Sequence, residues 1–293
     1  MSAPAATAKT APTPPTALIA LVVGAVAMGI SPIFVRLADV GPFASAFWRV
    51  FLALPILYAW TLVSPSGKSV ERRFSKSALL AGLAFTGDLF CWHLSIVSTS
   101  VADATFFATT APIWVVLFGW ALFRVRPTRA ILLGLALCLI GGAALLAQSL
   151  QFNPAHAVGD LFGLATGVFF GLYFLAVEAA RRNAGAARVT FEATLITAAL
   201  LFLVALALEG RIMPHSQRGF AALVALAWIS HVGGQGLLSV ALGRLPAAFS
   251  SLVIFLEALA AAGFAALFLA EPVSLVQALG GALILAGIFV ARP

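Results

Sequence analysis

Four ionisable side chains lie near the middle of long apolar stretches of the sequence: Asp88, His93, His231 and Glu257. At the centre of a lipid bilayer each such group costs at least about 2.5–3.5 kcal/mol, so it needs an interior partner or a water-filled path. In a path they would bind the charged parts of a solute or pass protons. The alternative is a set of hydrogen bonds that hold helices together.

Helical spacing sorts these residues into two polar and aromatic stripes. At about 100° per residue, Asp88 shares a face with Trp92 and Ser95, whereas His93 points about 140° away from Asp88. A second stripe falls in the eighth apolar stretch and consists of Trp228, His231, Gln235 and Ser239. We predict that the two stripes face each other.

Aromatic side chains at membrane depth also require a reason, because Trp and Tyr usually gather at the two membrane interfaces. Trp92, Tyr173 and Trp228 are candidates for a pocket that holds a flat apolar side chain, with ordinary core filling as the alternative. Arg49 lies about 10 Å inside the outer end of its stretch and is a candidate gate residue, with snorkelling to the interface and direct contact with substrate as alternatives. Pro112 is a candidate hinge, because proline frees a carbonyl and kinks a helix, with a merely bent helix as the alternative.

The elements that must position these residues are membrane helices. Of the 293 residues, 62% are hydrophobic and 9% are charged, whereas about 25% are charged in a soluble domain. A helix needs roughly 20 apolar residues to cross the hydrocarbon core. Ten stretches qualify, and they cover residues 17–36, 43–63, 77–98, 101–123, 129–149, 160–181, 189–208, 219–241, 246–269 and 274–291. The sequence therefore predicts an all-α integral membrane protein with ten transmembrane helices.

The distribution of Lys and Arg predicts the orientation of these helices. With the N-terminus inside, 13 basic residues fall in connectors on the cytoplasmic side, and three fall on the other side: Arg36, Arg211 and Arg218. Since cytoplasmic loops carry the excess of positive charge, both termini are predicted to be cytoplasmic. Residues 1–16 are rich in Ala, Pro and Thr and predict a disordered tail without a cleaved signal peptide.

The two halves of the chain resemble each other. Adding 145 to positions in the fourth and fifth stretches reaches identical residues in the ninth and tenth: Ala102 and Ala247, Phe123 and Phe268, Pro127 and Pro272, Gly142 and Gly287. Five helices per half is an odd number, so the second half must enter the membrane from the opposite side. We predict two inverted five-helix domains, at residues 17–149 and 160–291.

Three segments of the second half carry a family resemblance: 251–257 (SLVIFLE), 268–272 (FLAEP) and 280–287 (GGALILAG). Together with a matching pattern around residues 110–142, they resemble the repeat of the drug/metabolite transporter superfamily, EamA type. Within it, the chain is most similar to the YddG-like bacterial inner-membrane exporters of aromatic amino acids. The chain departs from the family pattern at Arg126, where an acidic residue is expected, and at Ala258, where proline is frequent, so no acidic role is carried over to position 126.

The resemblance implies a multi-pass protein of the bacterial inner membrane that exports amino acids, chiefly aromatic and other large apolar ones, by alternating access around a central cavity. We expect it to function as a monomer, with facilitated efflux favoured and proton coupling open. The predicted pathway consists of Asp88, Trp92, His93, Tyr173, Trp228, His231, Gln235 and Glu257, with Pro112 and Arg49 as hinge or gate. No cofactor, metal or nucleic-acid partner is predicted.

Two other functions compete with amino acid export. An antiporter of sugar phosphates or nucleotide sugars would need several buried Lys or Arg side chains for its dianionic phosphate, and only Arg49 qualifies. An intramembrane enzyme is disfavoured because the sequence lacks H-E-x-x-H and G-x-S-x-G motifs and an acidic pair on one helix. A P-loop is also absent from the sequence, so ATP does not drive transport directly.

Overall fold

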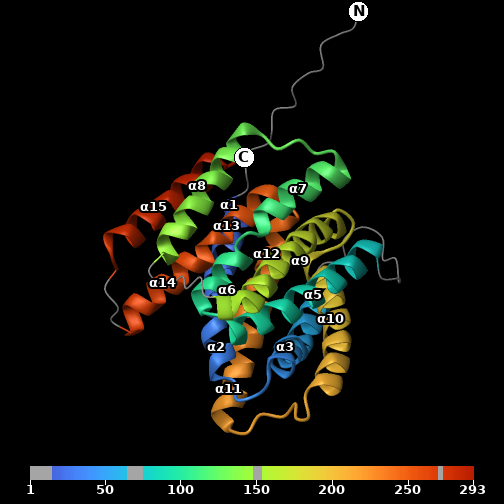
Figure 1. Cartoon of the computed structure of the whole chain (residues 1–293). Helices are drawn as coiled ribbons and strands as arrows, with labels where there is room; N and C mark the ends of the chain where they lie inside the picture. Colours follow the sequence, from blue (N-terminus) through green and yellow to red (C-terminus); the bar gives the residue numbers. More distant parts are fainter. Residues whose placement is uncertain (1–14, 65–74, 148–153, 270–272) are drawn as a thin grey trace, which may run out of the picture.

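The structure is a computed structural model that describes residues 15–64, 75–147, 154–269 and 273–293, and helices are the regular secondary structure of these residues (Figure 1). Among them, nine helical stretches are long and apolar enough to cross a membrane, and a tenth apolar helix, α15 (Leu275–Val290), is shorter. The prediction of an all-α membrane protein is confirmed. Glu271 and Pro272, and position 149 at the predicted domain boundary, lie outside the described residues.

The helical stretches follow the sequence prediction to within three residues at each end. In chain order they are α1 (Pro15–Gly29) with α2 (Ser31–Leu37), α3 (Pro42–Phe51) with α4 (Leu54–Val63), α5 (Lys76–Ser98), α6 (Val101–Ala108) with α7 (Ala111–Phe123), α8 (Arg129–Leu146), α9 (Ala157–Arg181), α10 (Ala186–Leu208), α11 (Gln217–Ala225) with η2 (Leu226–Gln235) and α12 (Gly236–Leu242), α13 (Ala247–Val253) with α14 (Phe255–Leu269), and α15. An even number of crossings puts Pro15 and Pro293 on the same face of the bundle. We call it the termini face and the other the opposite face.

Several stretches are interrupted near their middle. Proline accounts for three of the breaks, because Pro32, Pro55 and Pro112 each lie at the first or second position of the helix that follows the break. Pro112, the predicted hinge, therefore ends one helix and begins the next. The break at Ile254, between α13 and α14, comes without a proline in the first turn that follows.

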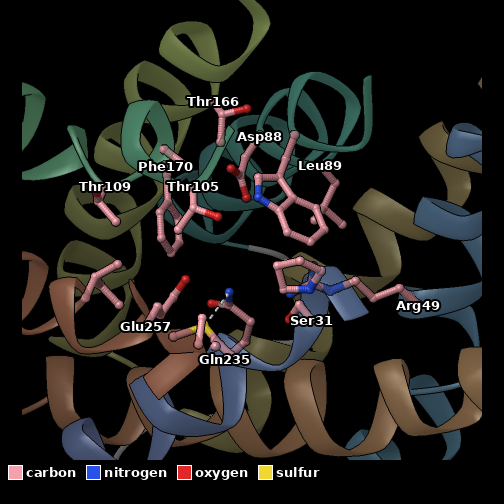
Figure 2. Close-up of a pocket in the computed structure, with 17 residues that line it drawn as sticks. Ser31, Arg49, Asp88, Leu89, Thr105, Thr109, Thr166, Phe170, Gln235 and Glu257 are labelled. Atoms are coloured by element: carbon pink, nitrogen blue, oxygen red, sulfur yellow. Dashed lines mark hydrogen bonds between the residues drawn. The ribbon is translucent and has the colours of Figure 1, made fainter. Parts of the chain in front are cut away.

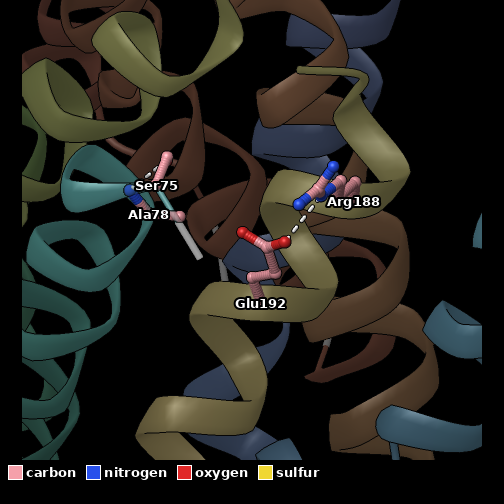
Figure 3. Close-up of polar contacts among 4 residues, drawn as sticks. All are labelled: Ser75, Ala78, Arg188 and Glu192. Carbon is pink, nitrogen blue, oxygen red and sulfur yellow. Dashed lines mark hydrogen bonds and ion pairs between the residues drawn. The ribbon is translucent and has the colours of Figure 1, made fainter. Parts of the chain in front are cut away.

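Two acidic residues near helix starts make different contacts. Ser100 caps α6, and its hydroxyl accepts from the backbone N–H of Asp103 at 2.9 Å. Glu192 lies in the second turn of α10, which begins at Ala186, and it pairs with Arg188 at 2.6 Å (Figure 3). The helix begins earlier than its apolar run, because residues 186–188 form its first turn at the membrane edge.

The core is built from two groups of helices. In group A, α5 packs along α9, which also contacts α6 and α7; in group B, α1 packs against η2, α12 and α14, with α2 and α13 continuing these helices. Helix α10 packs on α5, α3 and α4, while α8 and α15 lie side by side at one edge (Figure 1). Small residues on α9 allow close approach within group A, since a Cβ at Gly167 would lie 3.0 Å from the Phe107 carbonyl oxygen.

Candidate central cavity

A cavity of about 50 Å³ lies between groups A and B, near the middle of the bundle (Figure 2). Its walls come from α1, α2, α3, α5, α6, α9, η2 and α14 and from the breaks at Thr109 and Ile254. The lining includes Ser31, Arg49, Asp88, Trp92, Thr105, Thr166, Phe170, Gln235 and Glu257.

Three charged side chains face this cavity. Asp88 from group A and Glu257 from group B reach in from opposite sides, and Arg49 enters from α3 (Figure 2). Asp88 is 6% exposed and Arg49 is 4% exposed. Within the described part of the chain, none of the three makes an ion pair within 4.0 Å. Buried charges without partners are costly, so this arrangement leaves binding capacity for a charged solute.

Arg49 is held by an aromatic ring. Its guanidinium carbon lies 5.4 Å from the centroid of the Trp92 ring, a distance typical of cation–π contacts. Its buried Nε atom has no hydrogen-bond partner among the described residues. The guanidinium is therefore positioned by stacking, and its donors are available to an acceptor in the cavity.

Neutral polar groups complete the lining. Gln235 donates from Nε2 to the sulfur of Met28 at 3.2 Å, while its Oε1 has no partner in the described chain. The hydroxyls of Ser31 and Thr166 are likewise unpartnered among described residues. Sequence reasoning missed these hydroxyl residues, because Ser and Thr are frequent in membrane helices. For Ser31 the neighbouring Pro32 was the available signal, whereas Thr166 lies within the unbroken α9 and had none.

The structure brings together Asp88, Trp92, Gln235 and Glu257, four residues of the predicted pathway, and adds Arg49, which the sequence suggested as a gate. Phe170 lines the cavity as well and offers a second aromatic face. The carboxylates can accept from an ammonium group and the guanidinium can donate to a carboxylate. Among the described residues, no three His, Cys, Asp or Glu side chains form a group that could hold a metal ion.

Three other predicted residues lie outside the lining. His93 is fully buried, with Nδ1 2.8 Å from the Leu89 carbonyl oxygen, and its ring lies edge-on to Trp92. His231 places Nε2 2.9 Å from the Thr194 hydroxyl of α10. Tyr173 packs on Phe85 with ring centroids 4.7 Å apart. The contacts of His231 and Tyr173 join helices, which is the alternative role considered for polar groups at this depth, whereas those of His93 stay within α5.

The structure places Trp228 away from the cavity, contrary to the sequence prediction. It is 52% exposed, and its Nε1 donates to the Leu52 carbonyl oxygen at 3.2 Å. The cause is η2, a π-helix whose hydrogen bonds run from residue i to i+5, so that successive residues turn through a smaller angle than in an α-helix. Trp228 and Gln235 consequently do not share a face. Trp228 instead satisfies a carbonyl freed by the break between α3 and α4.

Comparison with known proteins agrees with this architecture. The model of the EamA-like transporter family matches residues 15–147 and again residues 157–292. The chain is 25% identical over 234 residues to the pseudopaline exporter of Pseudomonas aeruginosa, covering 79% of this chain and 80% of the exporter. It is 27% identical over 280 residues to an uncharacterized transporter of Archaeoglobus fulgidus, covering 93% and 94%.

A solved crystal structure of a protein shares the fold, with a TM-score of 0.81 and 20% identity over 95% of this chain and 97% of that one. The family model establishes the family, the solved structure shows the fold alone, and neither the relatives nor that structure is described as an exporter of aromatic amino acids. The two consecutive family matches agree with a chain made of two related halves.

Proposed function

The chain belongs to the EamA-like transporter family, and we propose that it exports amino acids, preferentially aromatic and other large apolar ones, by alternating access around the central cavity. One observation carries the proposal: Asp88, Glu257 and Arg49, unpaired with one another, surround a space walled by Trp92 and Phe170. We place it in the inner membrane of a bacterium as a monomer with both termini in the cytoplasm.

The charged groups suit the head of an amino acid. The planar guanidinium of Arg49 can donate two parallel hydrogen bonds to a carboxylate. Asp88 and Glu257 can accept from the ammonium group. Because the carboxylates belong to different helix groups, a bound ammonium would contact both sides of the passage. Binding would thus favour one arrangement of helix groups A and B over the other, as alternating access requires.

The remaining lining suits an apolar side chain. Trp92 and Phe170 offer aromatic faces, and Leu89, Ile254 and Ala261 offer aliphatic surface. Burying a second charge of the solute there would cost several kcal/mol, on the order of the penalty for an unpaired buried ion. Large apolar amino acids should therefore bind better than acidic ones.

The same charges disfavour a phosphorylated sugar. A dianionic phosphate would meet one guanidinium and two carboxylates, so attraction and repulsion would oppose each other. The pseudopaline exporter, at 25% identity, indicates that relatives at this distance export other solutes.

Counterflow in liposomes tests the proposal. Purified protein is reconstituted with unlabelled phenylalanine inside, and uptake of labelled phenylalanine is competed by leucine, glutamate and glucose 6-phosphate. We expect leucine to compete best. Stronger competition by glutamate or by the sugar phosphate would refute the assignment. Trp92→Leu should weaken phenylalanine uptake, whereas Trp228→Leu, a loss of the same side chain outside the cavity, should leave it unchanged.

Coupling is tested in the same vesicles. We favour facilitated efflux, in which the carboxylates hold the substrate while it moves down its own gradient. An imposed pH gradient should then leave phenylalanine at equal concentrations on both sides. Uphill movement driven by that gradient would replace facilitated efflux with proton coupling.

A further inference from the structure

We propose that Arg36 and Arg181 are a pair of gate residues, related by the internal repeat, that close opposite ends of the passage between groups A and B in alternate conformations. The inference rests on the alternating access of the proposed function. It concerns positioning of the helices, since neither arginine lines the central cavity.

The repeat makes these two arginines equivalent. The offset of 145 residues, found in the sequence for the fourth and fifth stretches, carries α1–α2, residues 15–37, onto residues 160–182, and α9 spans Ala157–Arg181. It carries α3–α4, residues 42–63, onto 187–208, where α10 spans Ala186–Leu208. Under the same offset Arg36 falls on Arg181. Each lies in the last turn of its membrane stretch, on opposite faces of the bundle.

Arg181 closes the termini face. From group A, its Nε donates to the Ser239 carbonyl oxygen in the last turn of α12, in group B, at 2.8 Å. Its Nη1 donates to the Ala184 carbonyl oxygen, which fixes the guanidinium. One turn earlier on α9, Glu178 accepts from the backbone N–H of Ala247 at 3.4 Å, at the start of α13. Both ends of the α12–α13 connector are thus tied to α9.

Arg36 makes the equivalent contact loosely on the opposite face. From group B, its Nη2 reaches the Ile96 carbonyl oxygen in the last turn of α5, in group A, at 3.4 Å. That distance is at the weak end of hydrogen bonds, and the Arg36 side chain is exposed. The two equivalent arginines therefore both bridge groups A and B. Arg181 reaches from group A to group B with a short hydrogen bond, and Arg36 reaches from group B to group A with a long one.

The cavities agree with closure at the termini face. The central cavity extends toward the opposite face, since Ser31, Pro32 and Thr105 line it. A second cavity of about 310 Å³ lies between α7, α9 and α13 beside Glu178 and is lined by Leu175, Pro246 and Ala248 among others. Along α9 the two cavities are separated by residues 171–174, which include the fully buried Tyr173 and Phe174.

Polar atoms near the termini face lack partners in this conformation. The hydroxyls of Ser239 and Ser250 and the indole Nε1 of Trp114 are buried without a hydrogen bond among described residues. Buried polar groups are usually satisfied, so each unpaired one needs an explanation. Opening of the termini face would hydrate these groups. In that state Arg181 would release Ser239, and Arg36 would tighten on Ile96.

Cysteine labelling in detergent tests the pair, because both faces are then accessible to a soluble maleimide. The native Cys91 and Cys138 are replaced by alanine, and single reporters are introduced as Ser250→Cys, near the termini face, and Thr105→Cys, in the central cavity. We expect Arg181→Ala to raise the labelling rate of the first reporter by about ten-fold, equivalent to about 1.4 kcal/mol, and to lower that of the second. Arg36→Ala should shift both rates the other way.

Matched controls separate a gate from a general loss of charge or fold. Arg126→Ala on the termini face and Arg211→Ala on the opposite face remove exposed arginines and should leave both rates at the unsubstituted level. Arg181→Lys, which keeps the charge but loses the fork of donors, should give a partial shift if the alanine variant fails to fold. Unchanged rates in Arg181→Ala, or shifts of the same sign for both arginines, would overturn the proposal.

The experiment is independent of the substrate. Labelling is measured without any solute, so opposite shifts together with absent amino acid counterflow would refute the proposed function and keep the gate pair. Intact phenylalanine counterflow with unchanged labelling in Arg181→Ala and Arg36→Ala would refute the gate pair alone.

Discussion

Replacing Arg49 with glutamine removes the guanidinium that faces Asp88 and Glu257 across the central cavity, and it keeps a polar side chain in that place. If Arg49 holds the carboxylate of an amino acid, the variant should lose affinity for that group specifically. Arg49 donors are available for this role, because its buried Nε is unpartnered and no ion pair within 4.0 Å occupies it in the described chain.

The size of the effect follows from these contacts. A hydrogen bond to a charged group contributes about 1.5–3 kcal/mol, which corresponds to a rise in the dissociation constant of roughly ten- to 150-fold. The cation–π contact with Trp92 at 5.4 Å exists without substrate, so its loss should lower the stability of the protein rather than its affinity. Arg49→Lys keeps the charge but loses the bidentate fork, so its affinity for the substrate should lie between those of the unsubstituted protein and of Arg49→Gln.

The assay compares phenylalanine with phenylalaninamide, which keeps the ammonium group and the ring but lacks the carboxylate. Each competes with labelled phenylalanine in counterflow, for the unsubstituted protein and for Arg49→Gln. The unsubstituted protein should prefer phenylalanine, and the variant should lose this preference. Arg211→Gln, on the surface, is the matched control and should keep it.

Two results would refute this reasoning. If the unsubstituted protein accepts the amide as well as the acid, Arg49 does not bind the substrate carboxylate. If Arg49→Gln loses affinity for both compounds to the same degree, the guanidinium supports the fold or the conformational change rather than the carboxylate. Thermal unfolding in detergent distinguishes a role in the fold from a role in the conformational change, because only a role in the fold lowers the unfolding temperature strongly.

Three further predictions concern topology, pH and packing. A cysteine at position 126 should react with an impermeant maleimide from the cytoplasm, and one at position 213 from outside. Reaction of both from the same side would refute the ten-helix topology. The hydrogen bond from the Ser216 side chain holds the pKa of Asp39 below its ordinary value of 3.8. The contact should therefore persist at pH values above 3.8 and be lost as the pH falls through the lowered pKa. Protease access to residues 209–216 should accordingly rise only below about pH 4. Gly141→Leu should lower the unfolding temperature, because a Cβ at Gly141 would lie 2.6 Å from the Gly280 carbonyl oxygen; an unchanged temperature would mean that α8 and α15 separate easily.

The spans were predictable because lipid imposes a strong rule on sequence. A chain that crosses a bilayer has to place charged residues in its connectors and apolar residues between them, so composition alone marks most helix ends. The breaks were partly predictable. Pro112 signalled one, but the break at Ile254 has no proline in the turn that follows it and is found only by applying the offset of 145 to Thr109.

Side-chain direction was harder to predict than depth. The placement of Trp228 failed because α-helical spacing was applied to a π-helix, and a π-helix depends on tertiary contacts such as those of η2 with α1. Arg49 was placed at the correct depth, about 10 Å from the start of its helix. That Arg49 lines the central cavity could not be predicted, because the cavity extends toward the opposite face and the packing of separate helices determines that extent.

The interrupted helices explain how a symmetric scaffold acquires an asymmetric site. Irregular backbone inside a membrane is tolerated where it lines a cavity, and the breaks at Thr109 and Ile254, equivalent under the repeat, both line the central cavity. Three residues after each break the two halves differ: the first has Pro112, which cannot donate a backbone hydrogen bond, and the second has Glu257. The first half thus carries a rigid break, while the second half carries a charge at the equivalent position. Because Asp88 comes from the first half, the pair of carboxylates arises from different positions of the repeat, and the cavity can present its charges to a solute that is itself asymmetric.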